Sequence, residues 1–401
     1  MMPIRKLRVI SCAAAVLVTL EVCARIDDRI RYGVPFTALS YEEMIWGSDE
    51  IGRTGVPNAS YHEFQLNNLG YRSPALRPGT LRILCIGASE TWGTANTHGH
   101  EYPRQLERML NESLHTQSIE VVNLGMPSEN AAQERQRMPQ IIDRLHPDIV
   151  LFYPAPVTYG WAAVQSVLKS GRRAPGAART PAPLSLPRRI YVRARNKADE
   201  IAARCYKYLR FTVFKNIGSG PELFRMEAKI GDLEFHMQPE AVMGIRARVE
   251  TRFRRWRISA YFPRVADDAA PLFREDMAAM ADELDAHGIR TVLVQHANSI
   301  VLPRDADMLR IWNSYYPYTD ASELLRMEDR LNDMVAEVAH ERNLPLIDAR
   351  VIPKERRYFS DFVHFTDEGA ILMAKLLADR IQPLVAEELT RRASTASSVP
   401  R

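Results

Sequence analysis

The stretch LRILCIGASETWG occupies residues 81–93 and decides the fold class. Its first half, Leu81 to Ile86, is a short apolar run that ends at Gly87, which is typical of a strand buried on both faces of a parallel sheet. Ser89 follows directly after that strand. The carboxyl ends of the strands in an open α/β sheet form the edge at which such folds bind ligands. We therefore expect Ser89 at that edge, although a Gly-x-Ser turn is also a common helix N-cap.

Strands and helices alternate on both sides of a long interruption. This order predicts a doubly wound α/β domain, in which a parallel sheet forms the middle of three layers. The expected strands after the first one are residues 119–124, 148–153, 291–295 and 345–348, and the expected helices are residues 102–114, 131–145, 276–287, 322–342 and 367–385.

The domain organisation follows from where this alternation stops. Residues 78–160 and 268–388 carry the α/β pattern and are large enough together for one domain. Residues 26–77 form an N-terminal extension, and residues 161–267 form an insertion that begins with a segment rich in Pro, Ala and Arg. We expect the tail, residues 389–401, to be disordered.

Composition excludes several classes of protein. The 401 residues are 46% hydrophobic and 25% charged, which is ordinary for a globular chain and excludes collagen-like, wholly disordered and multi-span membrane proteins. Four cysteines at wide spacings fit neither a zinc cluster nor a dense disulfide framework. Cys85 lies in the first strand and is expected to be a small buried apolar residue.

The first 25 residues are predicted to be an export segment. Arg5, Lys6 and Arg8 precede an apolar run over residues 9–24, as in a signal peptide or a signal anchor. Anchoring would leave the chain at the inner membrane with its catalytic domain in the periplasm, whereas cleavage would release it. Both readings place the chain outside the cytoplasm.

Near the other end, Asp361-Phe362-Val363-His364 immediately precedes the last expected helix. A histidine can accept the proton of a serine hydroxyl, and a carboxylate three residues earlier can hydrogen-bond the other ring nitrogen and fix its tautomer. By itself, Asp-x-x-His is more often a helix cap or an exposed pair than a catalytic dyad.

Taken together, these motifs resemble the SGNH (GDSL-like) hydrolase family. Besides the two catalytic motifs, the resemblance rests on Val122-Asn123-Leu124-Gly125 after the second strand and on Pro147-Asp148-Ile149-Val150, which leads into the third. Residues 67–72 (NNLGYR) look like a segment that often precedes the core in exported members. The resemblance implies that Ser89 is the nucleophile of an esterase or acyltransferase, that His364 is its base and that Asp361 orients His364.

The sequence departs from the family at two places. Ala88 replaces the Asp of the Gly-Asp-Ser block, which is a common variation. The oxyanion hole is the larger difference, because the family's asparagine is missing from residues 152–158 and its glycine position falls on Ser128. The backbone N–H of Ser128 and the side chain of Asn130 or Thr158 are the candidate replacements.

We expect neither a cofactor nor a metal. The sequence has no Walker loop, no Gly-x-Gly-x-x-Gly and no His-Glu-x-x-His, and His98 and His100 have no second cluster to complete a metal site. The expected substrate is an acyl ester, with an O-acetyl group on an envelope glycan as the leading example. A catalytically inactive domain that binds glycan or assembles an envelope complex is the alternative, and a lipid-directed esterase is a third reading.

The insertion contains the charge asymmetry of the chain. Residues 169–216, the basic stretch, hold 13 Lys or Arg against only two acids, Asp199 and Glu200. A solvated loop is the simplest reading. Anionic lipid headgroups or an acidic polysaccharide are the expected partners if it binds something, and nucleic acid is not expected outside the cytoplasm.

Overall fold

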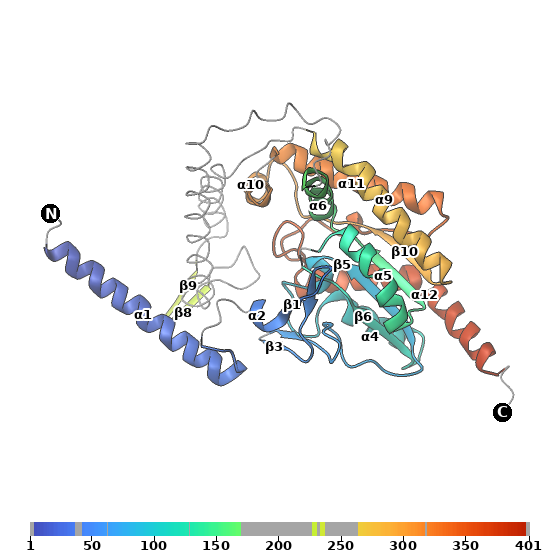
Figure 1. Ribbon diagram of the computed structural model, residues 1–401, viewed down its shortest axis with the longest axis horizontal. Helices are drawn as coiled ribbons and strands as arrows, with labels where there is room; N and C mark the ends of the chain where they lie inside the picture. Colours follow the sequence, from blue (N-terminus) through green and yellow to red (C-terminus); the bar gives the residue numbers. More distant parts are fainter. Residues whose placement is uncertain are drawn as a thin grey trace.

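A parallel sheet of five strands lies at the centre of the computed structural model (Figure 1), which describes residues 4–36, 42–61, 63–127, 129–169, 227–230, 233–236, 264–316 and 319–397. The strand order is β11-β10-β7-β5-β6, and each neighbouring pair is parallel. The strands are β5 (Leu81–Gly87), β6 (Ile119–Asn123), β7 (Ile149–Tyr153), β10 (Arg290–Gln295) and β11 (Leu346–Asp348).

The side chains of β5 explain why this run is a central strand. Ile83 and Cys85 pack into the core on one face of the sheet, and Leu84 and Ile86 pack into the core on the other. All four are at most 2% exposed. A strand that is apolar on both faces is stable only between two layers of helices. The α/β class and the doubly wound parallel sheet are therefore confirmed, as is the burial of Cys85.

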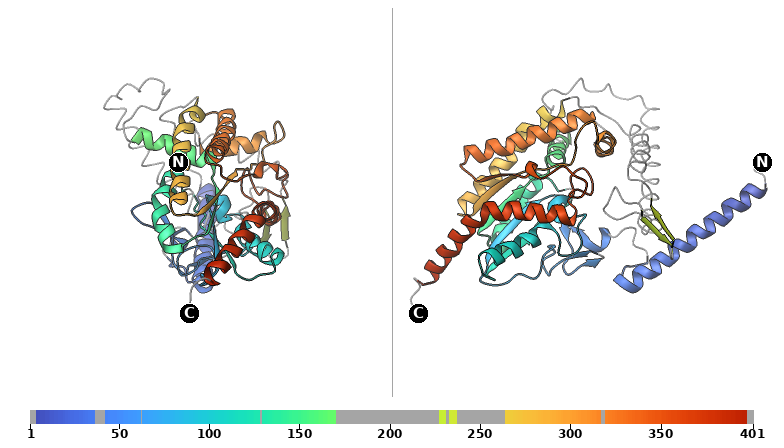
Figure 2. Two further views of the ribbon diagram at one scale, coloured as in Figure 1. Left: turned by 90° about the vertical axis from the view of Figure 1, so that its right-hand side faces the viewer. Right: turned by 180° about the vertical axis from the view of Figure 1, so that it is seen from behind.

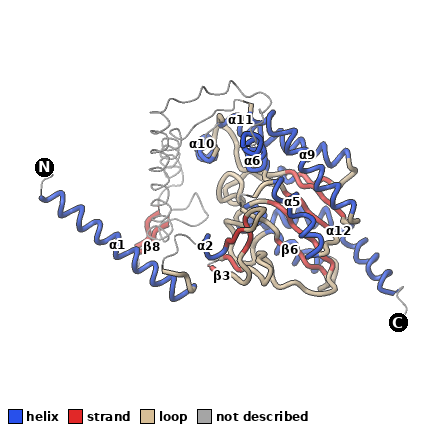
Figure 3. The backbone as a smooth tube through the Cα atoms, in the orientation of Figure 1, coloured by secondary structure: helices blue, strands red, loops and turns tan. Residues whose placement is uncertain are grey.

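Helices cover both faces of the sheet, so that the strands lie between two helical layers (Figure 3). The helices α4 (Tyr102–Ser113) and α12 (Asp367–Ser397) lie side by side on one face (Figure 2). The opposite face is covered by α5 (Ala131–Leu145), α6 (Pro156–Lys169), α9 (Val265–Ala286) and α11 (Ala321–Glu341). Two short elements precede α11 and α12, namely α10 (Ala306–Tyr315) and the 3-10 turn η1 (Ala349–Val351).

The α/β core is longer than the sequence pattern indicates. α6 continues to Lys169 and α9 begins at Val265, so both helices enter the segment that we assigned to the insertion. The first turns of α9 belong to the core because Val265, Ala269 and Phe273 are fully buried. Within the rest of the insertion the structure describes only the antiparallel pair β8 (Glu227–Ile230) and β9 (Leu233–His236). The basic stretch beyond Lys169 lies outside the described residues.

The end of α12 corrects a second boundary. The helix continues to Ser397, so the prediction of a disordered tail from residue 389 is wrong over residues 389–397. Arg392 fixes this end to the core, because its guanidinium lies 2.9 Å from Asp148 Oδ1 and donates to the carbonyl of Thr80 at 2.7 Å. These contacts join residues more than 240 positions apart, which a local reading of the tail cannot anticipate.

The N-terminal region has its own short elements. Helix α1 covers Ile4–Tyr32 and contains the segment predicted to direct export. No helix in the described part of the chain is long and apolar enough to cross a membrane. The extension forms α2 (Glu42–Ile45), β1 (Trp46–Ser48), β2 (Arg53–Gly55), β3 (Ser60–Tyr61) and β4 (Phe64–Gln65).

The extension packs directly beside the proposed nucleophile. A small apolar cluster joins Ile45, Tyr61 and Leu66 of the extension to Trp92, which follows Ser89 by three residues. Trp92 is 2% exposed, and the rings of Trp46 and Phe64 lie against it. The extension therefore packs against the carboxyl edge of the sheet, next to Ser89.

Candidate active site

Ser89 stands where β5 ends and the short helix α3 (Ser89–Trp92) begins. The turn is tight enough to require glycine before it, because a Cβ on Gly87 would lie 2.4 Å from the carbonyl oxygen of Tyr153. Gly93 ends α3 with a φ of +80°, a conformation that glycine adopts without strain. Two glycines thus present Ser89 at the carboxyl edge of the sheet.

The segment around Asp361 and His364 is a closed loop between η1 and α12. Phe359 and Phe365 form a β-bridge at its base, and the N–H of Ser360 donates to the carbonyl of His364 at 2.8 Å. Inside the loop, Asp361 Oδ1 accepts from the backbone N–H of Val363 at 2.9 Å and of His364 at 2.8 Å. The loop therefore holds the carboxylate with its own backbone and leaves Oδ2 for another partner.

Ser89, His364 and Asp361 form a continuous chain of hydrogen bonds. His364 Nδ1 lies 2.6 Å from Asp361 Oδ2, and His364 Nε2 lies 2.8 Å from Ser89 Oγ. A nucleophile, a base and an orienting carboxylate at these distances meet the geometric requirement for activating a hydroxyl. The structure brings the three sequence-predicted residues together at one edge of the sheet.

The electrostatics of this chain favour the protonated imidazole. Burial disfavours a charged imidazole, but the Asp361 carboxylate outweighs burial and raises the pKa of His364 to about 9. Glu90 acts in the same direction and the cationic His296 acts against it. A histidine of this kind is a strong base once it has lost its proton.

The candidate oxyanion donors do not all converge on this site. Ser89 is the first residue of α3, so its backbone N–H has no partner within the helix. Ser128 lies outside the described residues. Thr158 Oγ1 is hydrogen-bonded to the hydroxyl of Tyr316 at 2.9 Å.

Asn130 is corrected from a candidate oxyanion donor to a helix cap. Its Oδ1 accepts from the backbone N–H of Gln133, and its Nδ2 donates to Gln133 Oε1 at 2.5 Å. Together with the return bond from the Asn130 backbone, these contacts form a capping box at the start of α5. The side-chain amide has a structural role, so it does not supply the asparagine that the family uses.

A buried charged cluster that the sequence pattern does not predict lies next to Ser89. It consists of Glu90 beside the serine, His296 after β10 and Glu328 on α11, each at most 5% exposed. His296 Nδ1 lies 2.5 Å from Glu328 Oε1, and His296 Nε2 lies 3.6 Å from Glu90 Oε1. Glu90 is visible in the first motif, but a lone histidine after a strand and a glutamate on a helix carry no signal in a single sequence.

Arg72 connects the extension to the loop that follows Ser89. Its guanidinium is 1% exposed and donates to the carbonyl oxygens of Trp92 at 2.9 Å, Gly93 at 2.5 Å and Asn96 at 3.0 Å. Glu101, 3.7 Å away, supplies the compensating charge. Arg72, the last residue of the segment 67–72, thus ties this segment to the end of α3, the short helix that begins at Ser89.

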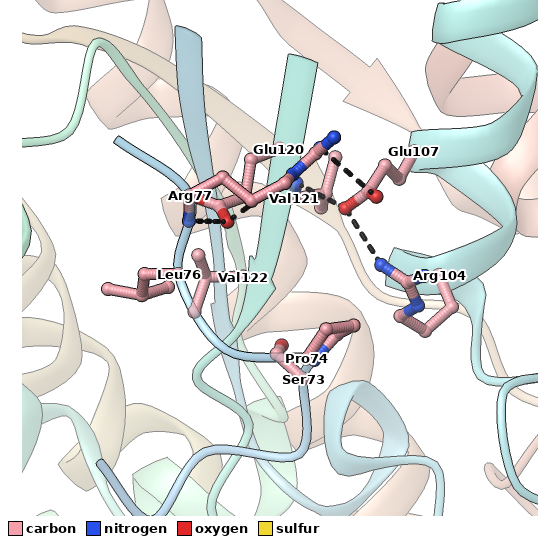
Figure 4. A pocket seen from close by; sticks show the side chains of 9 residues that line it. All are labelled: Ser73, Pro74, Leu76, Arg77, Arg104, Glu107, Glu120, Val121 and Val122. Carbon is pink, nitrogen blue, oxygen red and sulfur yellow. Dashed lines mark hydrogen bonds and ion pairs between the residues drawn. The ribbon is translucent and has the colours of Figure 1, made fainter. Parts of the chain in front are cut away.

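Two other features lie outside this arrangement. A pocket between residues 73–77, β6 and α4 is lined by neither the serine, the aspartate nor the histidine, and its arginines and glutamates pair with one another (Figure 4). His100 lies 4.0 Å from Asp367, and no group of three or more metal-ligating side chains occurs in the described part of the chain.

Comparison with solved structures finds distant likenesses. One is a lipase/acylhydrolase from Enterococcus faecalis, with a TM-score of 0.38 and 13% identity over 75% of this chain and 95% of the other. Another is a variant of an acetyl xylan esterase from Geobacillus stearothermophilus, with a TM-score of 0.40 and 12% identity over 76% of this chain and 95% of the other.

No family model matches the sequence. No curated protein matches it either. At these identities and TM-scores, function has to be inferred from the residues of this chain and their arrangement.

Proposed function

We propose that this chain is a serine esterase or O-acyltransferase of the SGNH type that acts on acyl esters through Ser89, His364 and Asp361. The observation that carries the proposal is the hydrogen-bond chain from Ser89 Oγ to His364 Nε2 at 2.8 Å and from His364 Nδ1 to Asp361 Oδ2 at 2.6 Å. Its position at the carboxyl edge of a parallel sheet, where α/β folds bind ligands, supports the same assignment.

Acylation would use each residue in one role. Ser89 Oγ attacks the carbonyl carbon of the ester while His364 Nε2 takes the hydroxyl proton. Asp361 keeps the proton on Nδ1 and stabilises the imidazolium that forms. The ester bond then breaks, His364 passes its proton to the departing alcohol, and the acyl group remains on Ser89.

Deacylation decides between the two activities. Water attacking the acyl-serine gives a carboxylic acid and defines an esterase, whereas a sugar hydroxyl gives a new ester and defines a transferase. His364 would serve as the base for either attacking hydroxyl. An O-acetyl group on an envelope glycan is the substrate class that we propose.

The alternative function is an inactive SGNH-like binding domain, and one observation favours it. The Asn130 amide caps α5 and is not a free oxyanion donor, and the Thr158 hydroxyl is already hydrogen-bonded to Tyr316. Losing one oxyanion donor typically costs about 3–4 kcal/mol of transition-state stabilisation. Slow turnover is therefore expected unless the backbone N–H groups of Ser89 and Ser128 suffice.

The decisive experiment compares the full chain with Ser89→Ala. Hydrolysis of an aryl acetate and labelling by a fluorophosphonate should both occur in the unmodified chain and both disappear in the variant. Ser394→Ala is the matched control, because Ser394 is exposed on α12 and donates only to the carbonyl of Thr390. It should retain activity and labelling.

A second arm tests transfer. An acceptor polysaccharide is added to the same acyl donor, and acetylated product is measured by mass spectrometry. Ester formation that requires Ser89 supports a transferase. No hydrolysis, no labelling and no transfer would refute the catalytic proposal and favour the inactive binding domain.

We also propose that the chain acts outside the cytoplasm. The support is the sequence pattern of residues 5–24, a basic end followed by an apolar run. Fractionation of cells that express the chain, with mass spectrometry of its N-terminus, tests this location and shows whether the segment is cleaved.

Anionic vesicles and an acidic polysaccharide are the two probes for binding by the basic stretch.

A further inference from the structure

Glu90 places a second carboxylate beside the nucleophile. Its Oε2 lies 3.3 Å from Ser89 Oγ and accepts a hydrogen bond from it, on a side chain that is 4% exposed. The serine hydroxyl, which has one proton, therefore has two acceptors within reach, Glu90 Oε2 and His364 Nε2.

His296 is held on every side. Its ring stacks on Tyr153 with centroids 5.0 Å apart, and its backbone N–H donates to Asn332 Oδ1 at 2.7 Å. Glu328, one turn before Asn332 on α11, approaches Nδ1, while Glu90 faces Nε2. Glu328 Oε1 is within hydrogen-bond distance of Nδ1, and Glu90 Oε1 lies 3.6 Å from Nε2. Both carboxylates attract the imidazolium, which carries a proton on each nitrogen.

This arrangement keeps Glu90 ionised. A carboxylate buried alone would take up a proton, because burial disfavours the charged form. Here burial raises the pKa of Glu90 but the cationic His296 outweighs it, so that the pKa lies well below its usual range. Burial likewise disfavours a charged His296, and the carboxylates of Glu328 and Glu90 raise its pKa nonetheless.

The protonation of His364 decides which acceptor the serine uses. When Nε2 carries a proton it donates to Ser89 Oγ, and the serine proton then points to Glu90. When Nε2 has lost its proton, the hydroxyl donates to His364 at the shorter distance, which is the orientation for attack. A negative Glu90 stabilises the first, waiting arrangement and raises the pH at which the second becomes available.

The other groups around Glu90 do not change this conclusion. The tyrosines that face it from α4, α6, β7 and the end of α10 remain neutral because burial raises the pKa of each of them. The ionisable groups concerned are His296, Glu328, His364, Asp361, Tyr102, Tyr153, Tyr159 and Tyr316.

We infer that Glu90 is a positioning residue for the reaction proposed above: held in place by the buried pair of His296 and Glu328, its carboxylate orients the Ser89 hydroxyl and controls the pH at which His364 becomes a base. The inference rests on the proposed function. It assigns His296 and Glu328 the supporting role of keeping that carboxylate charged.

The test is the pH profile of Glu90→Gln, with kcat/KM measured on an aryl acetate from pH 5 to 10. The amide keeps the size and a hydrogen-bond acceptor but removes the charge. We expect the midpoint of the acid limb to move to lower pH by about one unit. The activity of the variant relative to the unmodified chain should therefore be up to about tenfold higher at pH 6 than at pH 10.

Glu388→Gln is the matched control. Glu388 is likewise a buried glutamate, 2% exposed, but its partner is Arg391 and it lies near the distant end of α12. Its variant should leave the midpoint where it is. A Glu90 that only fills space would lower kcat/KM equally at all pH values and leave the midpoint unmoved, which would overturn the inference.

NMR of nitrogen-15-labelled histidine gives a readout that needs no substrate. The His364 imidazole, assigned by comparison with His364→Asn, should titrate at lower pH in Glu90→Gln than in the unmodified chain. Equal titration would overturn the inference while leaving the proposed function intact. If the unmodified chain shows no Ser89-dependent turnover, the proposed function is refuted instead. The NMR measurement still decides whether Glu90 acts on His364.

A measurement on the unmodified chain covers the case in which Glu90→Gln does not fold. His296 should carry both ring protons at pH 7, where the proposed role of Glu90 requires the cation. A neutral His296 at pH 7 would overturn the inference.

Discussion

Asp361 uses its two carboxylate oxygens for different purposes. Oδ1 accepts two backbone N–H groups and shapes the loop, while Oδ2 bonds to His364 and orients the imidazole. Substitutions can therefore separate the structural contribution from the catalytic one.

For Asp361→Asn we predict a loss of catalysis with little loss of stability. The amide oxygen can still accept the backbone N–H groups, but the amide nitrogen faces Nδ1 as a donor and favours the wrong tautomer of His364. We expect kcat to fall by about 10⁴-fold, the size seen when a triad aspartate is replaced by asparagine, and the melting temperature to stay near that of the unmodified chain. Asp361→Ala should lower both kcat and the melting temperature. Near-normal turnover by Asp361→Asn would exclude the orienting role of Asp361.

The pH dependence of the unmodified chain follows from the charge on His364. Below its pKa of about 9 the imidazole is protonated and cannot accept the serine proton. We predict that kcat/KM rises about tenfold per pH unit up to roughly pH 9 and levels off above it. An acid limb with a midpoint near 6.5, the ordinary value for histidine, would contradict the electrostatic role of Asp361.

The sequence could predict the triad because each member sits in a short motif at the end of an element. Glu90 was visible in the first motif, but its partner His296 was not, since a lone histidine after an apolar strand is most simply a core residue. Asn130 shows the opposite case. The sequence alone is compatible with an oxyanion donor at this position. The structure shows that a helix begins at Ala131 and that the Asn130 side chain caps it.

At the scale of elements, the turn between β5 and α3 has almost no spare room. Gly87 is packed against Tyr153 and Thr91, so that an added methyl group would come within 2.4 Å of each. The backbone of β5 would have to move away from β7, and Ser89 would move with it.

For Gly87→Ala we therefore predict that stability and activity fall together. Overpacking of this kind costs about 1–3 kcal/mol, to be measured by denaturant unfolding alongside kcat. Gly79→Ala is the control, because Gly79 has a positive φ of +75° but open space around it. It reports the backbone strain alone and should leave kcat unchanged, whereas an active and equally stable Gly87→Ala would show that the turn is not tightly constrained.

Periodicity predicted the strands and most helices, since their apolar faces are local properties of the sequence. The limits of α6, α9 and α12 could not be predicted in the same way. They depend on contacts such as the burial of Val265 and Phe273 in the core and the pairing of Arg392 with Asp148, which exist only after the chain has folded.

At the scale of the whole molecule, the N-terminal extension and the α/β core depend on each other through Arg72. Its buried guanidinium donates to three carbonyl oxygens, those of Trp92, Gly93 and Asn96, in the segment that follows Ser89. For Arg72→Lys we predict a loss of about 2–4 kcal/mol of stability and a lower kcat, because an ammonium cannot reach all of these acceptors.

Arg31→Lys provides the comparison for that variant. Arg31 also lies in the extension, but its side chain is 65% exposed and its ion pair with Asp27, itself 50% exposed, lies at the surface. Such pairs contribute about 0–1 kcal/mol, so stability measured by denaturant unfolding should change little. Equal losses in the two variants would contradict a special role for Arg72.

The two hydrogen bonds of the triad differ greatly in the length of chain that they close. Asp361 and His364 are three residues apart, whereas His364 and Ser89 are 275 residues apart. The first bond can form within its loop at any stage of folding, while the second needs the sheet and both helical layers to be assembled. Recovery of Ser89 reactivity during refolding should therefore lag behind recovery of helical structure, making the nucleophile a reporter of the final assembly step.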